Sequence, residues 1–126
     1  MTKKKYLKVE DIPVYNLAHE LVLEIYKLTY KFPKSEIFGL ISQLRRSSSS
    51  IPANIAEGFY RNSTKELIQF LYNARGSVGE TIYHLKLAYD LKYISKKEFD
   101  VLTNSYNVVG MQLNGWIKSL KAKLDH

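Results

Sequence analysis

Apolar residues recur at every third or fourth position along four long stretches of the chain, which only short connections separate. This spacing is typical of amphipathic α-helices that each bury one face. The helix ends are marked by Pro13 and Pro33 and by two capping-box sequences, Ser63-Thr64-Lys65-Glu66 and Ser95-Lys96-Lys97-Glu98. The predicted helices cover residues 13–32, 36–62, 64–91 and 96–124.

Four long helices with short connections must run up and down, because a few residues cannot carry the chain back along a helix of about 30 Å. No stretch shows the apolar–polar alternation of a β-strand. At 126 residues the chain has the length of one domain. We therefore expect an all-α fold, an antiparallel up-down four-helix bundle spanning residues 1–126, in which the basic residues 1–11 form a flexible tail.

Pro52 lies inside the second predicted helix. A proline there removes a backbone donor and crowds the carbonyl four residues back, which costs about 3 kcal/mol unless something compensates. Four serines, residues 47–50, come directly before it. Their hydroxyls can bond to nearby backbone carbonyls, and such bonds bend a helix without ending it. We expect one helix that is kinked at Pro52.

Characteristic motifs flank this proline on both sides. They are Phe38-Gly39-Leu40, Arg45-Arg46, Ser50-Ile51-Pro52-Ala53-Asn54-Ile55-Ala56-Glu57-Gly58, Lys65-Glu66 and Ala74-Arg75-Gly76-Ser77. Together they resemble a bacterial family of four-helix-bundle proteins encoded in intervening sequences of 23S ribosomal RNA genes, related to the accessory variability proteins of diversity-generating retroelements. The resemblance implies a closed ring, typically a pentamer, with a basic surface. Residues 47–49 depart from the family pattern, which has small apolar residues there.

The chain carries a formal net charge of +7, and all four of its arginines lie between residues 45 and 75. Arginine binds phosphate through a planar fork of donors. Two interpretations are open: a soluble protein with a mildly basic surface, or a nucleic-acid-binding face. The candidate nucleic-acid-binding residues are Arg45, Arg46, Arg61, Lys65 and Arg75.

A second set of apolar and small residues lies off the predicted core stripes. A second apolar surface on a small bundle usually marks a partner interface. Glycine inside a helix costs about 1 kcal/mol relative to alanine, so two glycines within one turn suggest close approach by another backbone. The alternative is a wide monomer core with a few exposed aromatics, and the tyrosines could also stack on bases. The candidate oligomer-interface residues are Leu23, Tyr26, Tyr30, Tyr72, Gly76, Gly79, Tyr83 and Leu87.

Several further side chains have local structural explanations. Glu57 precedes Arg61 by four residues, as in a helical ion pair, and Glu66 belongs to a capping box. We expect Glu80 to pair with an arginine of the same or a neighbouring subunit. The residues assigned structural roles are Pro52, Asn54, Glu57, Glu66 and Glu80.

No catalytic or metal-binding pattern stands out in the sequence. The three histidines, His19, His84 and His126, lack the spacing of metal ligands, and the chain has no cysteine and no glycine-rich phosphate loop after a strand. We expect no enzymatic activity, no metal and no cofactor. The N-terminal segment lacks the apolar block of a signal peptide, and no stretch has the length of a membrane span, so we expect a cytoplasmic protein without membrane contact.

These observations favour a non-enzymatic homo-oligomer, a pentamer by resemblance, whose basic surface binds nucleic acid, RNA or DNA, with RNA as the expected ligand. The alternative is a protein-interaction adaptor or accessory subunit, for example for a reverse transcriptase. The two functions could hold together.

Overall fold

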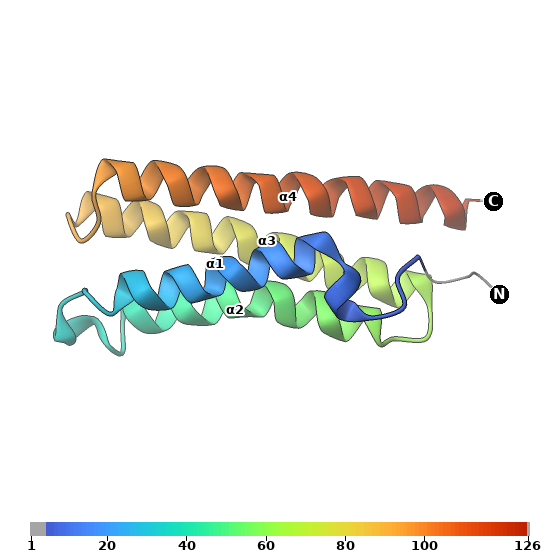
Figure 1. Cartoon of the computed structure of the whole chain (residues 1–126), viewed down its shortest axis with the longest axis horizontal. Coiled ribbons are helices and arrows are strands. Elements are labelled where there is room, and N and C mark those ends of the chain that lie inside the picture. The colour runs from blue at the N-terminus through green and yellow to red at the C-terminus, as the bar shows by residue number, and fades with distance from the viewer. Residues whose placement is uncertain (1–4, 126) are drawn as a thin grey trace.

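Four long α-helices make up most of the protein. The computed structural model describes residues 5–125, and its long helices are α1 (Pro13–Thr29), α2 (Leu40–Phe59), α3 (Thr64–Asp90) and α4 (Lys96–Leu124). Short 3-10 helices, η1 (Val9–Asp11) and η2 (Lys34–Glu36), precede α1 and α2. The long helices lie side by side along the longest axis (Figure 1), and residues 5–125 contain no strand. The predicted all-α four-helix bundle is confirmed.

The bundle is held together by one core that all four helices share. α2 packs against α1 and α3, α4 packs against α3, and α1 makes a smaller contact with α4. α1 and α3 therefore occupy opposite corners of the bundle. The core side chains that are most completely buried are Ile12, Ile25, Leu44, Ile51, Ile55, Leu71, Leu85, Tyr106, Val109 and Leu113. Burial raises the pKa of the Tyr106 hydroxyl, which therefore stays protonated in the core.

The described part of the N-terminal segment packs against the bundle. Residues 1–4 of the expected flexible tail lie outside the described part of the chain. Within its remainder, Val9 is buried in η1, and the Tyr6 ring meets the Trp116 ring edge-on, with centroids 5.8 Å apart. The buried Val9 and the neighbouring Ile12 bring this segment onto the core, and the flexibility expected of residues 1–11 stays a prediction.

α2 begins at Leu40 and not near Glu36, so the predicted start is wrong by about one turn. Ile37, which the apolar spacing placed on the stripe of this helix, is 55% exposed, and the neighbouring Phe38 is 93% exposed. Glu36 instead caps the helix from outside, because its Oε1 accepts a hydrogen bond from the Leu40 backbone N–H at 3.1 Å. That bond, followed by one from the Tyr93 hydroxyl, lowers the pKa of Glu36.

α2 continues through Pro52 as a single helix, as predicted, and the bend expected there stays a prediction. Each serine before the proline has its hydroxyl directed at the carbonyl three residues back, at 2.8 Å for Ser50 and 3.2–3.5 Å for the other three. Two of them also reach α3: Ser47 Oγ lies 2.9 Å from Thr81 Oγ1, and Ser50 Oγ lies 2.6 Å from Ser77 Oγ. We call Ser47, Ser50, Ser77 and Thr81 the hydroxyl ladder. One of its members, Ser47, lies in the stretch where the family pattern has small apolar residues.

The starts of α3 and α4 follow their capping sequences. The Ser63 hydroxyl accepts from the Glu66 N–H at 3.1 Å. At α4 both halves of the box are present, since Ser95 accepts from the Glu98 N–H at 3.0 Å and Glu98 accepts from the Ser95 N–H at 2.9 Å. These caps satisfy backbone donors that lack partners inside the helix.

Candidate nucleic-acid interface

Arg46 lies on the outward ridge of α2, where the helical period places it. Its guanidinium is exposed, and Nη2 donates a hydrogen bond to Gln43 Oε1 at 2.8 Å. This contact with a neutral side chain leaves the positive charge uncompensated. Arg46 can therefore reach a phosphate without breaking an ion pair.

Arg61 and Lys65 flank the turn between α2 and α3, and both are exposed. Arg61 Nη2 lies 2.7 Å from Glu57 Oε1, in the pair expected from their spacing. The guanidinium also lies 4.9 Å from the centre of the Phe70 ring. Because both partners of the ion pair are about half exposed, it is screened by water and salt, and a phosphate can compete with Glu57.

Arg45 faces a different direction, into the contact between α1 and α2. Its Nε donates to Thr29 Oγ1 at 3.0 Å, and its guanidinium lies 4.5 Å from the centre of the Tyr26 ring. Thr29 is itself buried and donates to the Ile25 carbonyl at 2.7 Å. These contacts fasten α1 to α2, so the structure gives Arg45 a position better suited to holding helices together than to binding phosphate.

Arg75 lies at the contact between α3 and α4. Its Nη1 donates to Asn114 Oδ1 at 3.0 Å, and its guanidinium lies 4.8 Å from the centre of the Tyr72 ring. Lys121 approaches the same tyrosine from α4, with Nζ 3.1 Å from the Tyr72 hydroxyl. The sequence reasoning missed Lys121. The spacing of seven residues puts it on one face of α4 with Asn114, but only the packing shows that this face meets Tyr72.

The five predicted cations are thus distributed over three places. Arg45 lies between α1 and α2, Arg75 lies between α3 and α4, and the other three follow the outer ridge of α2 to the α2–α3 turn. A single chain does not bring them together as one cluster.

The predicted oligomer-interface residues also occupy two places. Leu23 and Tyr30 on α1 and Tyr83 on α3 are exposed, and α1 and α3 are at opposite corners. A Cβ added to Gly76 or Gly79 would meet nothing within 4 Å. Tyr26 is also exposed, at 45%, although the Arg45 guanidinium lies over its ring, whereas Tyr72 and Leu87 pack partly against the core.

The structure adds an exposed apolar stripe on α4 that the sequence reasoning did not identify. Its members are Val101, Val108 and Met111, which are 56%, 43% and 72% exposed. Their spacing of seven and three residues is helical, so the stripe was detectable as a third surface.

Two structural residues have partners inside the chain. Asn54 donates through Nδ2 to the Ser50 carbonyl at 2.8 Å, just before the proline. Among residues 5–125 Glu80 forms no ion pair with an arginine of the same chain, and its pairing with an arginine of a neighbouring subunit stays a prediction. Its Oε2 lies 3.5 Å from His84 Nε2, one turn along α3, which is the nearer partner because helical neighbours four residues apart face each other.

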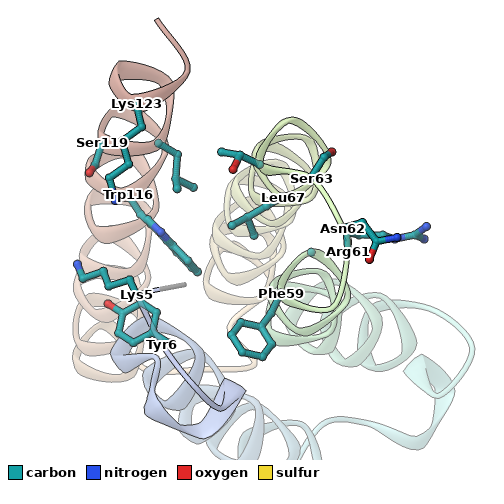
Figure 2. Close-up of a pocket in the computed structure, with 13 residues that line it drawn as sticks. Lys5, Tyr6, Phe59, Arg61, Asn62, Ser63, Leu67, Trp116, Ser119 and Lys123 are labelled. Atoms are coloured by element: carbon teal, nitrogen blue, oxygen red, sulfur yellow. The ribbon is translucent and has the colours of Figure 1, made fainter. Parts of the chain in front are cut away.

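An open pocket of about 320 Å³ lies at the end of the bundle where the N-terminal segment, the α2–α3 turn and α4 meet (Figure 2). Its walls are aromatic, with Tyr6, Phe59 and Trp116 coming from three distant parts of the sequence. Lys5, Arg61 and Lys123 also border it, and no carboxylate does so among the described residues. No sequence spacing connects these side chains, so only the fold could identify the pocket.

Within residues 5–125, no group of three or more histidine, aspartate and glutamate side chains is placed to hold a metal ion. None of the helices in this part of the chain combines the length and the apolar character needed to cross a membrane.

Comparison with known proteins points to one family. The sequence model of the family described as 23S rRNA-intervening sequence protein matches residues 10–115. A crystal structure of a protein of unknown function, from the S23 ribosomal protein family of Bacteroides thetaiotaomicron, is similar with a TM-score of 0.78 and 25% sequence identity. The similarity covers 88% of this chain and 99% of that one. Among curated proteins, none matches the chain.

Proposed function

The chain belongs to the family of 23S rRNA-intervening sequence proteins, and we propose that it is a non-enzymatic homo-oligomer whose basic surface binds nucleic acid, RNA in the first place. The observation that carries this proposal is the set of exposed cations outside the core, on a chain with a net charge of +7. The proposed contact residues are Arg46, Arg61, Lys65 and Arg75, with Lys121 added and Arg45 assigned to helix packing.

Assembly gives the scattered cations their combined effect. One chain offers only a few phosphate contacts in any one direction, whereas several copies on one particle repeat each of them. Phosphate contacts release counterions cumulatively, so repeated weak contacts add up to strong, salt-dependent binding. Arginine and lysine on phosphates do not read sequence, so specificity would come from the shape of the RNA.

The exposed apolar residues on α1 and α3 support a head-to-tail arrangement. Because Leu23 and Tyr30 lie at the corner opposite Gly76 and Tyr83, one subunit can place its α1 face against the α3 face of the next. Such a contact between two different surfaces closes into a ring when the rotation between subunits allows it. Five copies is the number that the family resemblance suggests.

The α4 stripe favours a second candidate function, an adaptor that binds another protein. Val101, Val108 and Met111 present apolar surface that the α1-to-α3 arrangement does not use. An accessory role, for example beside a reverse transcriptase, would use this surface and need no phosphate contact.

Binding of fluorescently labelled mixed RNA, followed by anisotropy over a series of salt concentrations, separates the two candidates. Phosphate binding predicts a steep, linear fall of the logarithm of affinity with the logarithm of salt concentration. The Arg46→Gln and Arg61→Gln double variant should bind more weakly and with a shallower slope, while Lys34→Gln, at the other end of the bundle, should change little. Weak or absent binding at low salt, or a flat salt dependence, would contradict the RNA proposal and favour the adaptor.

A further inference from the structure

The pocket at the α2–α3 end of the bundle is distinct from the dispersed phosphate contacts. Figure 2 shows the Trp116 ring projecting into it, with Tyr6 next to Trp116 and Phe59 on the α2 side. Tyr6 and Trp116 meet edge-on at 87°. Flat, apolar walls of this kind suit an aromatic ligand, since stacking uses the π-faces that the walls present.

The polar border of the pocket selects for negative charge. Lys5 and Lys123 border the opening, and no carboxylate among the described residues does so. Arg61 also borders it, but Figure 2 shows its side chain pointing away, where it pairs with Glu57. Figure 2 shows the Lys5 side chain turned outward as well, with Nζ 5.3 Å from the centre of the Tyr6 ring. The two lysines have no carboxylate partner at the border of the pocket, and their flexible stems let them reach a ligand there.

Other occupants match these features less well. An apolar peptide would leave the lysines without a partner, and an inorganic anion would leave the aromatic walls uncovered. A volume of about 320 Å³ is at the small end of ligand pockets and suits one unit of a polymer.

We propose that this pocket binds one unstacked nucleotide of single-stranded RNA, with the base against Trp116 and Tyr6 and the phosphate near Lys5 and Lys123. This inference rests on the proposed function, because the remaining nucleotides would run over the exposed cations. The end pocket would anchor one point of the strand, and the dispersed arginines would hold its flanks.

Trp116 is the only tryptophan of the chain, so its fluorescence reports on the pocket directly. An oligouridylate of about eight nucleotides should quench or shift the Trp116 emission in a saturable way, excited where RNA does not absorb. Inorganic phosphate at the same ionic strength should have no such effect. The same oligouridylate, carrying a label, gives total binding by anisotropy.

The two readouts distinguish the two proposals. Anisotropy that shows binding together with an unchanged Trp116 emission would overturn the pocket while leaving the proposed function intact. Absence of binding in both readouts would overturn the proposed function, and the pocket with it. A response to phosphate equal to the response to oligouridylate would show that no base is recognised, which would also overturn the pocket.

Variants test the walls and the border separately. Tyr6→Ala should weaken oligouridylate binding about fivefold or more, because one base–aromatic contact is lost. Phe38→Ala, an exposed aromatic at the opposite end, is the matched control and should change nothing. Lys123→Gln, which alters only an exposed side chain, should weaken the Trp116 response where Lys34→Gln does not. The assignment would be contradicted if, in proteins with unchanged helicity, Tyr6→Ala bound oligouridylate as tightly as Phe38→Ala. It would also be contradicted if Lys123→Gln gave the same Trp116 response as Lys34→Gln.

Discussion

The helical glycines on the two sides of the α2–α3 pair have sharply different surroundings. A Cβ added to Gly58 on α2 would lie 2.8 Å from Phe70 Cβ and 3.0 Å from Leu67 Cδ1 on α3. A Cβ added to Gly76 or Gly79, on the outward face of α3, would meet nothing within 4 Å. The packing of a single chain therefore explains why position 58 is a glycine, because the missing side chain lets α2 and α3 approach each other closely. The other two glycines cost helix stability without any such gain in one subunit.

The α2–α3 contact and the outward face of α3 also differ in which polar and aromatic side chains they contain. The α2–α3 contact holds the hydroxyl ladder, in which Ser47 and Thr81 are almost fully buried and bonded to each other. The outward face of α3 holds the exposed Tyr83 beside the two glycines. The buried hydroxyls and the exposed tyrosine are both exceptions to the usual distribution of polar and apolar residues. The inner surface is complete within one chain, and the proposed assembly assigns the outer surface to a second copy.

The largest expected effect is the loss of assembly when the outer face is filled. Gly76→Leu should leave the subunit folded, since space is open there, but should separate the copies because the new side chain stands where the neighbour packs. Size-exclusion chromatography with light scattering measures the mass. Gly115→Leu, at an equally open glycine on α4, is the control and should assemble normally. If Gly76→Leu also kept the wild-type mass, the outer α3 face would not be the interface.

The inner glycine should respond in the opposite way. Gly58→Ala should lower the free energy of unfolding by about 1–2 kcal/mol, because overpacking against Phe70 outweighs the gain in helix propensity of about 1 kcal/mol. Gly110→Ala is the matched control: its Cβ would lie at an ordinary 3.9 Å from Val78 Cγ1, so it should be stabilising. Urea denaturation followed by circular dichroism measures both. A stabilised Gly58→Ala protein would show that α2 and α3 are not in tight contact there.

The hydroxyl ladder should contribute a smaller, pairwise amount. A double-mutant cycle with Ser47→Ala and Thr81→Val should give a coupling energy of about 0.5–1.5 kcal/mol, as for a buried hydrogen bond between neutral groups. Ser49 bonds only locally to the Arg46 carbonyl, so the cycle with Ser49→Ala and Thr81→Val should give no coupling. Equal coupling energies in both cycles would mean that the Ser47–Thr81 hydrogen bond makes no specific contribution to stability.

The smallest effect concerns pH. The hydroxyl ladder contains no carboxylate, whereas Glu98, which caps α4, has a lowered pKa because the Ser95 N–H and then Lys31 bond to its charged form. A lowered pKa in the folded state means that its contribution is present above the ordinary value of 4.5 and is lost as the pH falls below it. In the Glu98→Gln variant the side chain can still accept the capping hydrogen bond but has no proton to titrate. The free energy of unfolding of this variant should therefore depend less on pH below about 4.5 than that of the wild type. Superimposable acid curves would contradict this role.

The helices and their caps were predictable because they depend on local signals. Ser63 and Ser95 start α3 and α4 as their sequences indicate. The start of α2 was not predictable in the same way, because Ile37 continues the apolar period although it lies exposed in the connection. The spacing of apolar residues can indicate a helix without showing that each of these residues is buried.

The candidate sites depended on packing and were therefore only partly predictable. Exposed cations such as Arg46 followed from helical geometry, but the contact of Arg45 with Thr29 and Tyr26 required the position of α1. Lys121 meets Tyr72 across two helices, and the pocket joins Tyr6 to Trp116 across most of the chain. Contacts between residues so distant in sequence leave no periodic signal.

Sedimentation equilibrium of the wild-type protein at micromolar concentration tests the central claim, that a second copy completes the outer face of α3, most directly. The account predicts one species several times heavier than the 14.6 kDa chain, and five times heavier for the pentamer. A single species of 14.6 kDa across the concentration range would contradict it, because Gly76, Gly79 and Tyr83 would then face water in the functional protein.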